Sequence, residues 1–409
     1  MAKVLKKVKK PAGSSKRSKA SVNKKESKLL KKKSVFTPRK KLILKTKKVS
    51  KVKKNVKKII SKKTKRKIII KDKPKKELKR FVGNPIIHPA SNMYWESKAT
   101  FNPTAFVHDG KVHVVYRAVG VNDISTLGYA GSKDGYNFSE RTFKPIFIHK
   151  NYSSNTGEPI FYSSGGGWNG GAEDPRITKI DDRLYMTYTA FNGWGSVRIG
   201  LTSISLEDFL NKKWNWKKSV LISPPGEVNK NWVIFPEKIN GKYAIFHSFY
   251  PKILISYFKS LDELDGKKFI KSNNTRPVDK SRDWDSWFRG VGPAPIKTKY
   301  GWLVLYHAMD HKNPDRYRMG ALLLDLKDPT KILYRSKEPI LEPEAFYENQ
   351  GYKWGVVYSC GAVVKKGELF IYYGGADMVS CVATANLELF LKELMTTGIT
   401  KLKKGSKKN

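Results

Sequence analysis

The segment Gly171-Ala172-Glu173-Asp174-Pro175-Arg176-Ile177 places two adjacent carboxyl groups and one guanidinium around a proline. A carboxyl group held in a pocket can act as a general acid, whereas a carboxyl at a turn accepts backbone N–H groups. At a turn, Arg176 is the expected ion-pair partner of the acid. The motif alone favours the turn, so the elements that position it decide between the two interpretations.

Those elements follow one pattern that occurs five times after Phe81: a strand, a tight turn, a strand ending in Tyr or His, a loop and a third strand. The five end positions are spaced 72, 59, 59 and 67 residues apart, at Tyr116, Tyr188, His247, Tyr306 and Tyr373. Self-similarity at this period predicts an all-β fold, a five-bladed β-propeller, in preference to a β-sandwich with coincidental hairpins.

In a propeller, the residues that follow each inner strand gather at one mouth of the central channel. Here they are Arg117, Thr189, Ser248, His307 and Gly374, with Asp377 three residues beyond. This polar set predicts a ligand pocket. Because side chains alternate along a strand, only one of Glu173 and Asp174 is expected to point into the channel. An acid from this pair that points into such a pocket indicates glycoside cleavage, with a second carboxylate or phosphate as its partner.

Charge is distributed unevenly along the 409 residues, whose net charge is +46. Residues 1–80 contain 36 of the 81 Lys and Arg residues and three of the 35 acids, which leaves 45 basic and 32 acidic residues in the remainder. The sequence therefore predicts a disordered basic tail over 1–80, a catalytic propeller over 81–392 and a basic C-terminal tail over 393–409. The first tail is either a non-specific binder of nucleic acid and other polyanions or a solubilising extension.

The folded part resembles glycoside hydrolase family 130, the β-mannoside phosphorylases and related β-mannosidases. The motifs that carry this resemblance lie in order along nearly the whole of residues 81–390: FNPTAF (101–106), YRA (116–118), GAEDPRI (171–177), NKNWVIFPEKINGKY (229–243), GWLVLYHA (301–308), YRMGALLLDLKDP (317–329), EPEAFYENQG (342–351) and YYGGAD (372–377). The resemblance implies a five-bladed propeller that cleaves or forms β-mannosidic bonds with inversion, using β-mannoside oligosaccharides or glycosides as substrates.

The resemblance also implies roles for individual residues. Asp174 matches the catalytic acid. The positions that match the sugar-binding residues are Asn102, Arg117 and Asp377. The positions that match the phosphate-binding residues are Lys230, Arg289, His307 and Tyr317. Phosphorolysis to α-mannose 1-phosphate is the favoured reaction, with inorganic phosphate as co-substrate and no other cofactor.

One departure from the family pattern keeps a second reaction open. Many phosphorylases of the family have His-Arg after the third inner strand, whereas this chain has His247-Ser248. An inverting β-mannoside hydrolase is therefore the alternative, with Glu237 or Glu348 as a possible base for water. A non-catalytic propeller that binds glycans or polyanions is a further alternative. The segment 151–169 before the catalytic motif is expected to reshape the leaving-group subsites.

The remaining features exclude other classes of protein. The histidines lack the spacing of metal ligands, so no metal site is expected. Neither an apolar run of membrane-spanning length nor a secretory signal is expected, and Cys360 and Cys381 are too few for a disulfide framework. These features favour a cytoplasmic location. The segment LELFLKELMTTGITKLKKG predicts an amphipathic helix docked on the propeller.

Overall fold

The computed structural model describes residues 78–149, 170–191, 197–272, 278–280 and 282–398. The chain divides into two compact units, Met1–Lys71 and Asp72–Asn409, and every described residue belongs to the second. The predicted disordered state of the N-terminal tail and the predicted role of segment 151–169 lie outside the described residues, apart from the last three residues assigned to that tail.

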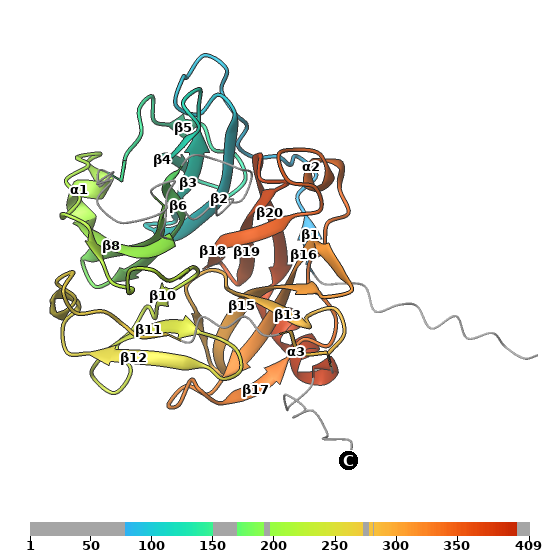
Figure 1. The fold of residues 1–409 in the computed structure, drawn as a ribbon. Helices are drawn as coiled ribbons and strands as arrows, with labels where there is room; N and C mark the ends of the chain where they lie inside the picture. Colours follow the sequence, from blue (N-terminus) through green and yellow to red (C-terminus); the bar gives the residue numbers. More distant parts are fainter. Residues whose placement is uncertain (1–77, 150–169, 192–196, 273–277, 281, 399–409) are drawn as a thin grey trace, which may run out of the picture. The chain divides into compact units, whose positions relative to one another are not determined.

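Strands dominate the second unit, which confirms the predicted all-β class (Figure 1). The strands are β1 (Lys79–Arg80), β2 (Ala99–His108), β3 (Lys111–Val119), β4 (Ile124–Ser132), β5 (Glu140–Arg141), β6 (Gly170–Ile180), β7 (Arg183–Phe191), β8 (Val197–Ser205), β9 (Val220–Leu221), β10 (Val233–Ile234), β11 (Tyr243–Ser248), β12 (Leu254–Phe258), β13 (Trp287–Val291), β14 (Ile296–Thr298), β15 (Gly301–Asp310), β16 (Asn313–Leu324), β17 (Ile332–Arg335), β18 (Val357–Lys365), β19 (Glu368–Gly375) and β20 (Val379–Asn386). The helices are α1 (Leu206–Leu210), the 3-10 helix η3 (Leu261–Glu263), α2 (Phe346–Asn349) and α3 (Leu387–Thr397).

The strands pair antiparallel in successive groups that correspond to the predicted repeats. The groups are β2-β3-β4, β6-β7-β8-β9, β10-β11-β12, β13-β15-β16-β17 and β18-β19-β20. The first two groups form one sheet because β4 and β6 pair in parallel at Ile124↔Gly170 and Ser125↔Gly171. Strand β1 pairs with β20, so Lys79 and Arg80 belong to the folded unit, two residues before the predicted start at Phe81.

The tyrosines at the predicted end positions pack in a repeated way. In three groups the ring covers a glycine of the next strand; the pairs are Tyr116–Gly128, Tyr188–Gly200 and Tyr306–Gly320. A Cβ atom on any of these glycines would lie 2.3 to 2.4 Å from the tyrosine Cζ, so no larger residue fits under the ring. The spacing of aromatic and small residues in the sequence thus reflects a real packing unit.

Three of the end-position tyrosines also donate their hydroxyl to a buried carboxylate that an arginine binds. These Tyr–acid–Arg clusters are Tyr116–Glu96–Arg141, Tyr306–Asp285–Arg335 and Tyr373–Glu348–Arg80. The acids are at most 2% exposed. Because a buried carboxylate needs both a counter-charge and hydrogen bonds, each cluster fixes a loop or edge strand against the sheet.

Irregular backbone interrupts β2 and β6 at equivalent places. The pairing of β2 with β3 shifts between Phe101 and Thr104, and the pairing of β6 with β7 shifts between Glu173 and Arg176. Each bulge contains an X-Pro pair, and its first residue has φ of +49°: Asn102 in β2 and Asp174 in β6. Asn and Asp tolerate this left-handed conformation better than other non-glycine residues. Bulges of this kind redirect side chains.

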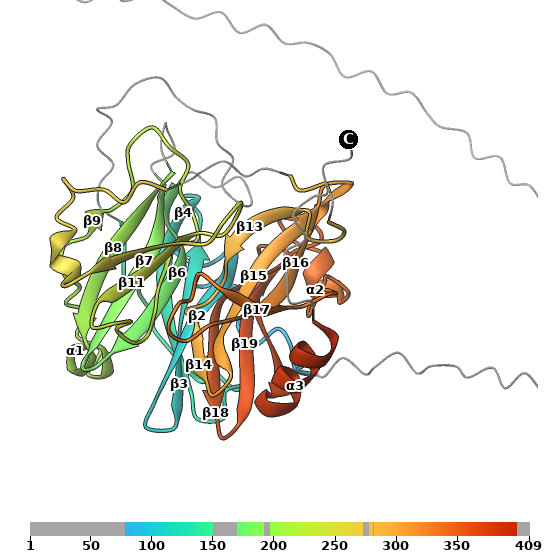
Figure 2. The ribbon, with the colours of Figure 1, turned by 90° about the horizontal axis from the view of Figure 1, so that it is seen from below.

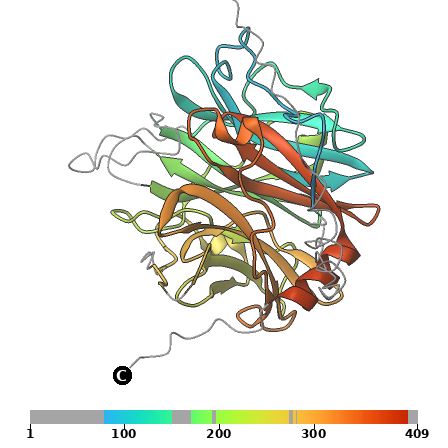
Figure 3. The ribbon, with the colours of Figure 1, turned by 90° about the vertical axis from the view of Figure 1, so that its right-hand side faces the viewer.

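The predicted C-terminal helix is confirmed. Helix α3 begins at Leu387, follows β20 directly and buries Phe390, Leu391 and Leu394. Figures 2 and 3 show it at one edge of the C-terminal strands, and it contacts β20 and β17. Asn386 caps the helix by accepting the Leu389 N–H. Within the described residues, no helix combines the length and the apolar character needed to cross a membrane.

Candidate active site

Asp174 lies at the centre of a buried polar cluster. Its Oδ1 accepts a hydrogen bond from Asn102 Nδ2 at 2.8 Å and one from Arg117 Nη1 at 3.3 Å. Asp174 is 5% exposed and Asn102 is 3% exposed. The two bulges therefore turn Asn102 and Asp174 toward each other, and the carboxyl group is held by side chains from β2 and β3.

Glu173 enters the same cluster, which corrects the expectation that only one of the two acids would. Its Oε1 accepts from Arg117 Nη2 at 3.0 Å, and its Oε2 lies 3.3 Å from Lys230 Nζ. The alternation argument was wrong because it assumed a regular strand. The bulge at Glu173–Arg176 places both carboxylates on Arg117.

Arg176 is not the hydrogen-bonded partner of the Asp174 carboxylate. Its guanidinium donates to the backbone carbonyls of Gly292 (2.8 Å) and of Asp174 itself (2.8 Å), and to Asn231 Oδ1 (2.9 Å). Asn231 also accepts from Tyr358 OH at 2.5 Å. The turn interpretation of the motif is therefore wrong. Arg176 fixes the backbone, and Asp174 directs its side chain to Asn102 and Arg117.

Asp377 is the third buried carboxyl of the site. It is 5% exposed, and its carboxyl group makes no hydrogen bond with any described residue. The loop that carries it is fixed close to Asn102, because a Cβ atom on Gly374 would lie 2.1 Å from Asn102 Oδ1. Asn102 Oδ1 is itself buried and without a hydrogen-bond partner among the described residues. These two groups are acceptors available to a ligand.

The electrostatic environment shifts the pKa values of Asp174 and Asp377 in opposite directions. Burial raises the pKa of Asp377 to about 6, although Lys353 and Arg117 act to lower it. Burial also acts to raise the pKa of Asp174, but the charges of Arg117 and Lys230 outweigh it and hold the pKa below its usual value. Without a ligand, the Asp174 carboxyl is therefore ionised at neutral pH, and Asp377 is the more easily protonated group.

His307 is part of the site but carries no charge. It is fully buried, and burial together with the charge of Arg176 lowers its pKa to about 3. The Ser359 N–H donates to its Nε2 at 2.9 Å, so the proton of the neutral ring is on Nδ1. Nδ1 has no partner within the described part of the chain. His307 therefore offers one neutral hydrogen-bond donor.

Arg289 and Tyr317 lie together in a pocket of about 520 Å³, whose lining also includes Trp287, Lys353 and Trp354. Arg289 Nε donates to Tyr317 OH at 3.0 Å. The pocket connects to the Asp174 cluster through Asn231, whose Nδ2 donates to the Arg289 carbonyl at 2.7 Å while its Oδ1 accepts from Arg176. This volume lies within the usual range of ligand pockets, roughly 300–1,000 Å³.

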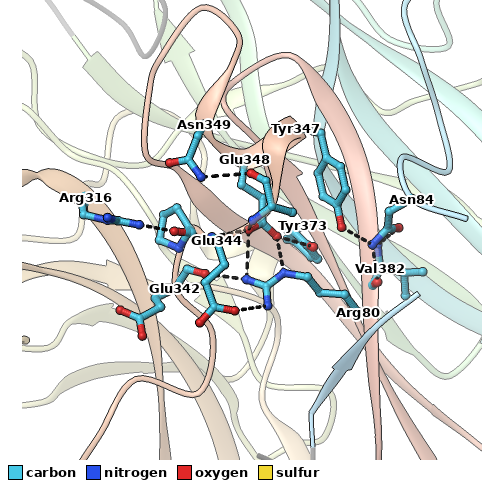
Figure 4. Close-up of polar contacts among 12 residues, drawn as sticks. Arg80, Asn84, Arg316, Glu342, Glu344, Tyr347, Glu348, Asn349, Tyr373 and Val382 are labelled. Atoms are coloured by element: carbon cyan, nitrogen blue, oxygen red, sulfur yellow. Dashed lines mark hydrogen bonds and ion pairs between the residues drawn. The ribbon is translucent and has the colours of Figure 1, made fainter. Parts of the chain in front are cut away.

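Neither of the two acids considered as a base for water lies in this cluster. Glu237 is half exposed and pairs with Lys297 at 2.5 Å. Glu348 is fully buried and accepts from Arg80 (2.7 Å), from Tyr373 OH (2.7 Å) and from the N–H groups of residues 344 and 345 (Figure 4). All of its acceptor positions are committed, so Glu348 is a structural acid and its proposed role as a base was wrong.

The structure thus brings together most of the residues singled out from the sequence. Asn102, Arg117, Asp174, Asp377, Lys230 and His307 belong to one buried cluster, and Arg289 and Tyr317 form part of the neighbouring pocket. Sequence reasoning missed Asn231 and Lys353. Asn231 stands in the quoted motif NKNWVIFPEKINGKY, which is a usable sequence signal, and the structure gives it a φ of +66°. Nothing in the sequence marks Lys353. Among the described residues, no group of three or more His, Cys, Asp or Glu side chains suits a metal ion.

Known proteins of one family are similar to this chain. The family model Glyco_hydro_130, described as beta-1,4-mannooligosaccharide phosphorylase, matches residues 70–396. A 1,2-beta-oligomannan phosphorylase of Thermoanaerobacter sp. (strain X514) is 42% identical over 323 residues, which cover 76% of this chain and 98% of that protein. A beta-1,2-mannobiose phosphorylase of the same strain is 38% identical over 324 residues, with the same two coverages.

A solved structure shows the same likeness. The beta-1,2-mannobiose phosphorylase from Listeria innocua, in complex with beta-1,2-mannobiose, matches with a TM-score of 0.60 and 27% sequence identity. The match covers 78% of this chain and 99% of that chain. In these relatives the matched region is nearly the whole protein, whereas in this chain it begins after a long basic segment.

Proposed function

Because this chain belongs to glycoside hydrolase family 130, we propose that it is an enzyme that phosphorolyses β-mannosides to α-mannose 1-phosphate. In this reaction a phosphate oxygen forms a bond to the anomeric carbon from the face opposite the glycosidic oxygen. The glycosidic C–O bond breaks, and the leaving oxygen receives a proton. The observation that carries the proposal is the buried Asp174 carboxyl, fixed by Asn102 and Arg117 near Asp377, whose carboxyl makes no hydrogen bond with a described residue.

Asp174 is the proposed acid, acting on the leaving oxygen directly or through a hydroxyl of the mannosyl unit. Its pKa lies below the usual value in the unliganded site. A phosphate dianion bound beside it raises that pKa, because a like charge disfavours ionisation. Proton uptake therefore accompanies phosphate binding, so Asp174 is protonated only when the phosphate nucleophile is bound.

The proposed sugar-binding residues act in two ways. Arg117 is fully buried and donates to Ser125 (2.9 Å), Glu173 and Asp174, so it positions the acid. Asp377 and Asn102 present free acceptor atoms, which suit vicinal hydroxyls of a mannosyl unit. Ionised Asp377 accepts two hydrogen bonds from such a diol, and Asn102 accepts one from another hydroxyl of the mannosyl unit.

The proposed phosphate-binding residues differ in what they contribute. Arg289 and Tyr317 supply a guanidinium and a hydroxyl in the pocket. Lys230 pairs with Glu173 in the Asp174 cluster, and His307 contributes a neutral Nδ1–H donor. Charge-assisted bonds from Arg289 and Lys230 favour an anion, and donors on several sides align it for attack.

A closed five-bladed β-propeller is the architecture that we propose for residues 81–392, with β1 (Lys79–Arg80) before them and the last turn of α3, to Thr397, after them. Contacts between the first and last strand groups support ring closure. The Thr100 N–H donates to the Met378 carbonyl at 2.9 Å, and Ser380 Oγ donates to the Thr100 carbonyl at 2.9 Å. A Cβ atom on Gly361 of β18 would lie 2.6 Å from the Ala105 nitrogen of β2, so the two backbones are in close contact.

The proposed substrates are β-1,2-linked mannooligosaccharides. The two relatives named above act on β-1,2 linkages, whereas the β-1,4-mannooligosaccharide phosphorylase of Ruminococcus albus is 29% identical.

The decisive experiment incubates the full-length protein with β-1,2- and β-1,4-mannobiose, with and without phosphate. We expect mannose 1-phosphate from the β-1,2 isomer only when phosphate is present. Free mannose formed at the same rate without phosphate would establish the hydrolase instead.

The basic N-terminal segment is proposed to act independently of catalysis, in a cytoplasmic enzyme. Its charge favours non-specific binding to nucleic acid or other polyanions. Full-length protein and a variant lacking residues 1–71 are to be compared for retention on single-stranded DNA at increasing salt. Equal retention of the two would remove this function from the tail.

A further inference from the structure

The pocket beside the Asp174 cluster contains a cation that the sequence did not single out. Lys353 lines this pocket, and its Nζ lies 4.3 Å from the centre of the Tyr317 ring. The guanidinium of Arg289 lies 5.5 Å from the same ring centre and 4.5 Å from that of Trp287. Two cations thus flank one phenol whose hydroxyl is already oriented by Arg289.

These two cations share the pocket with one carboxylate, Asp315, and the charge of Lys353 also acts on Asp377. Within the described residues, neither Lys353 nor Arg289 forms an ion pair with a carboxylate, and their partners are aromatic rings and the Tyr317 hydroxyl. Stacking on aromatic faces keeps a cation oriented and leaves its N–H groups available for hydrogen bonds. Paired cations with free donors are the arrangement that binds an inorganic anion.

Lys353 also connects the pocket to the proposed sugar site. Its backbone N–H donates to the Ala376 carbonyl at 3.0 Å, which fixes it one residue from Asp377 in the loop after β19. Among the surrounding charges, that of Lys353 contributes most to lowering the pKa of Asp377. Lys353 therefore lines the proposed phosphate pocket and is also close to the carboxyl proposed to hold the mannosyl unit.

We propose that Lys353 binds the attacking phosphate together with Arg289 and Tyr317, and holds it toward the anomeric carbon. This inference rests on the proposed phosphorolysis and adds a residue to its machinery. It also supplies a cation in a chain that has Ser248 where many relatives have an arginine. Trp287 and Trp354 line the same pocket and offer aromatic faces to a sugar, so the competing occupant of the Lys353 position is the leaving sugar.

The test is the replacement Lys353→Met in the full-length chain, with Lys353→Arg as the conservative variant. Initial rates are measured against phosphate at saturating β-1,2-mannobiose and against the mannoside at saturating phosphate. We expect the KM for phosphate to rise about 10- to 100-fold in Lys353→Met, with a small change in the KM for the mannoside. Lys353→Arg is expected to recover most of the loss, because it keeps the charge.

The controls separate this inference from the proposed function. Lys331→Met removes a surface lysine that pairs with Asp328 at 3.4 Å and is expected to leave both KM values unchanged. In the reverse direction, Lys353→Met should raise the KM for mannose 1-phosphate and spare the acceptor sugar. An unchanged KM for phosphate, or a rise confined to the mannoside, would overturn the assignment of Lys353. A wild-type protein without phosphate-dependent activity would instead overturn the proposed function.

Discussion

Replacing Asp377 by asparagine tests whether the site is built at a cost to stability. Burial raises the pKa of this carboxyl to about 6 in the folded chain, compared with about 3.9 in an unfolded one. Below about pH 3.9 both states hold the proton. Between about pH 3.9 and 6 the folded state retains a proton that the unfolded state has lost, so stability falls as pH rises. Above about pH 6 the full free-energy cost of ionising Asp377 in the folded state is present.

The size of this cost follows from the shift. Two pKa units at 1.36 kcal/mol each correspond to about 3 kcal/mol at pH 7.5. The asparagine side chain keeps the shape of the protonated acid, so Asp377→Asn should stabilise the protein by about 3 kcal/mol at pH 7.5 and by nearly nothing at pH 4. For a folded unit of about 320 residues, an unfolding entropy of about 2.1 cal/mol/K per residue converts this gain to about 4 °C in Tm.

The assay is thermal unfolding of both proteins from pH 4 to 8, with turnover measured on the same samples. Asp181→Asn is the matched control, because Asp181 is an exposed turn residue with a similar φ of +53°. It should change Tm by less than about 1 °C at every pH. The reasoning is refuted if Asp377→Asn lowers Tm at pH 7.5, or if its gain is the same at pH 4 and pH 7.5. Activity should be lost, because the amide cannot accept two hydrogen bonds from a diol on separate oxygens.

Three further substitutions test the role of Asp174, the contact between Gly374 and Asn102, and the structural role of Glu348. Asp174→Asn should lower kcat by about 10²- to 10⁴-fold while calorimetry still detects mannobiose binding, and a loss below tenfold would exclude Asp174 as the acid. Gly374→Ala should lower kcat/KM at least tenfold with a modest fall in Tm, because its Cβ atom displaces Asn102 Oδ1; unchanged kinetics would show that this contact is dispensable. Glu348→Gln should destabilise the fold by about 3 kcal/mol in urea unfolding yet retain turnover, whereas Glu344→Gln, at an exposed partner of Arg80, should cost less than about 0.5 kcal/mol. Loss of turnover in folded Glu348→Gln would restore its role as a base.

Much of the fold could be predicted because the repeat leaves direct marks on the sequence. The spacing of Tyr116, Tyr188 and Tyr306 corresponds to rings that cover a glycine of the next strand. The hydrophobic alternation of the strands and the amphipathic pattern of α3 follow from burial on one face. These are local rules, and they hold wherever the backbone is regular.

The errors in the site have a common cause, since they arise where the backbone or the burial departs from those rules. Alternation failed at Glu173 because a bulge follows it. The sequence also does not reveal that His307 is completely buried, and this burial keeps the ring neutral. Glu348 looked like a free acid because Arg80, its partner, is 268 residues away in the chain. Long-range pairing of this kind has no signature in a single sequence.

The left-handed backbone at Asn102, Asp174 and Asp377 limits which residues can occupy these positions. Glycine, asparagine and aspartate enter this conformation readily, and other residues do so at a cost on the order of 1–3 kcal/mol. The backbone at these positions therefore favours exchanges between amide, carboxylate and no side chain. One codon change from aspartate to asparagine at position 174 would give a protein that still binds the sugar but no longer turns it over. One further codon change would restore the aspartate.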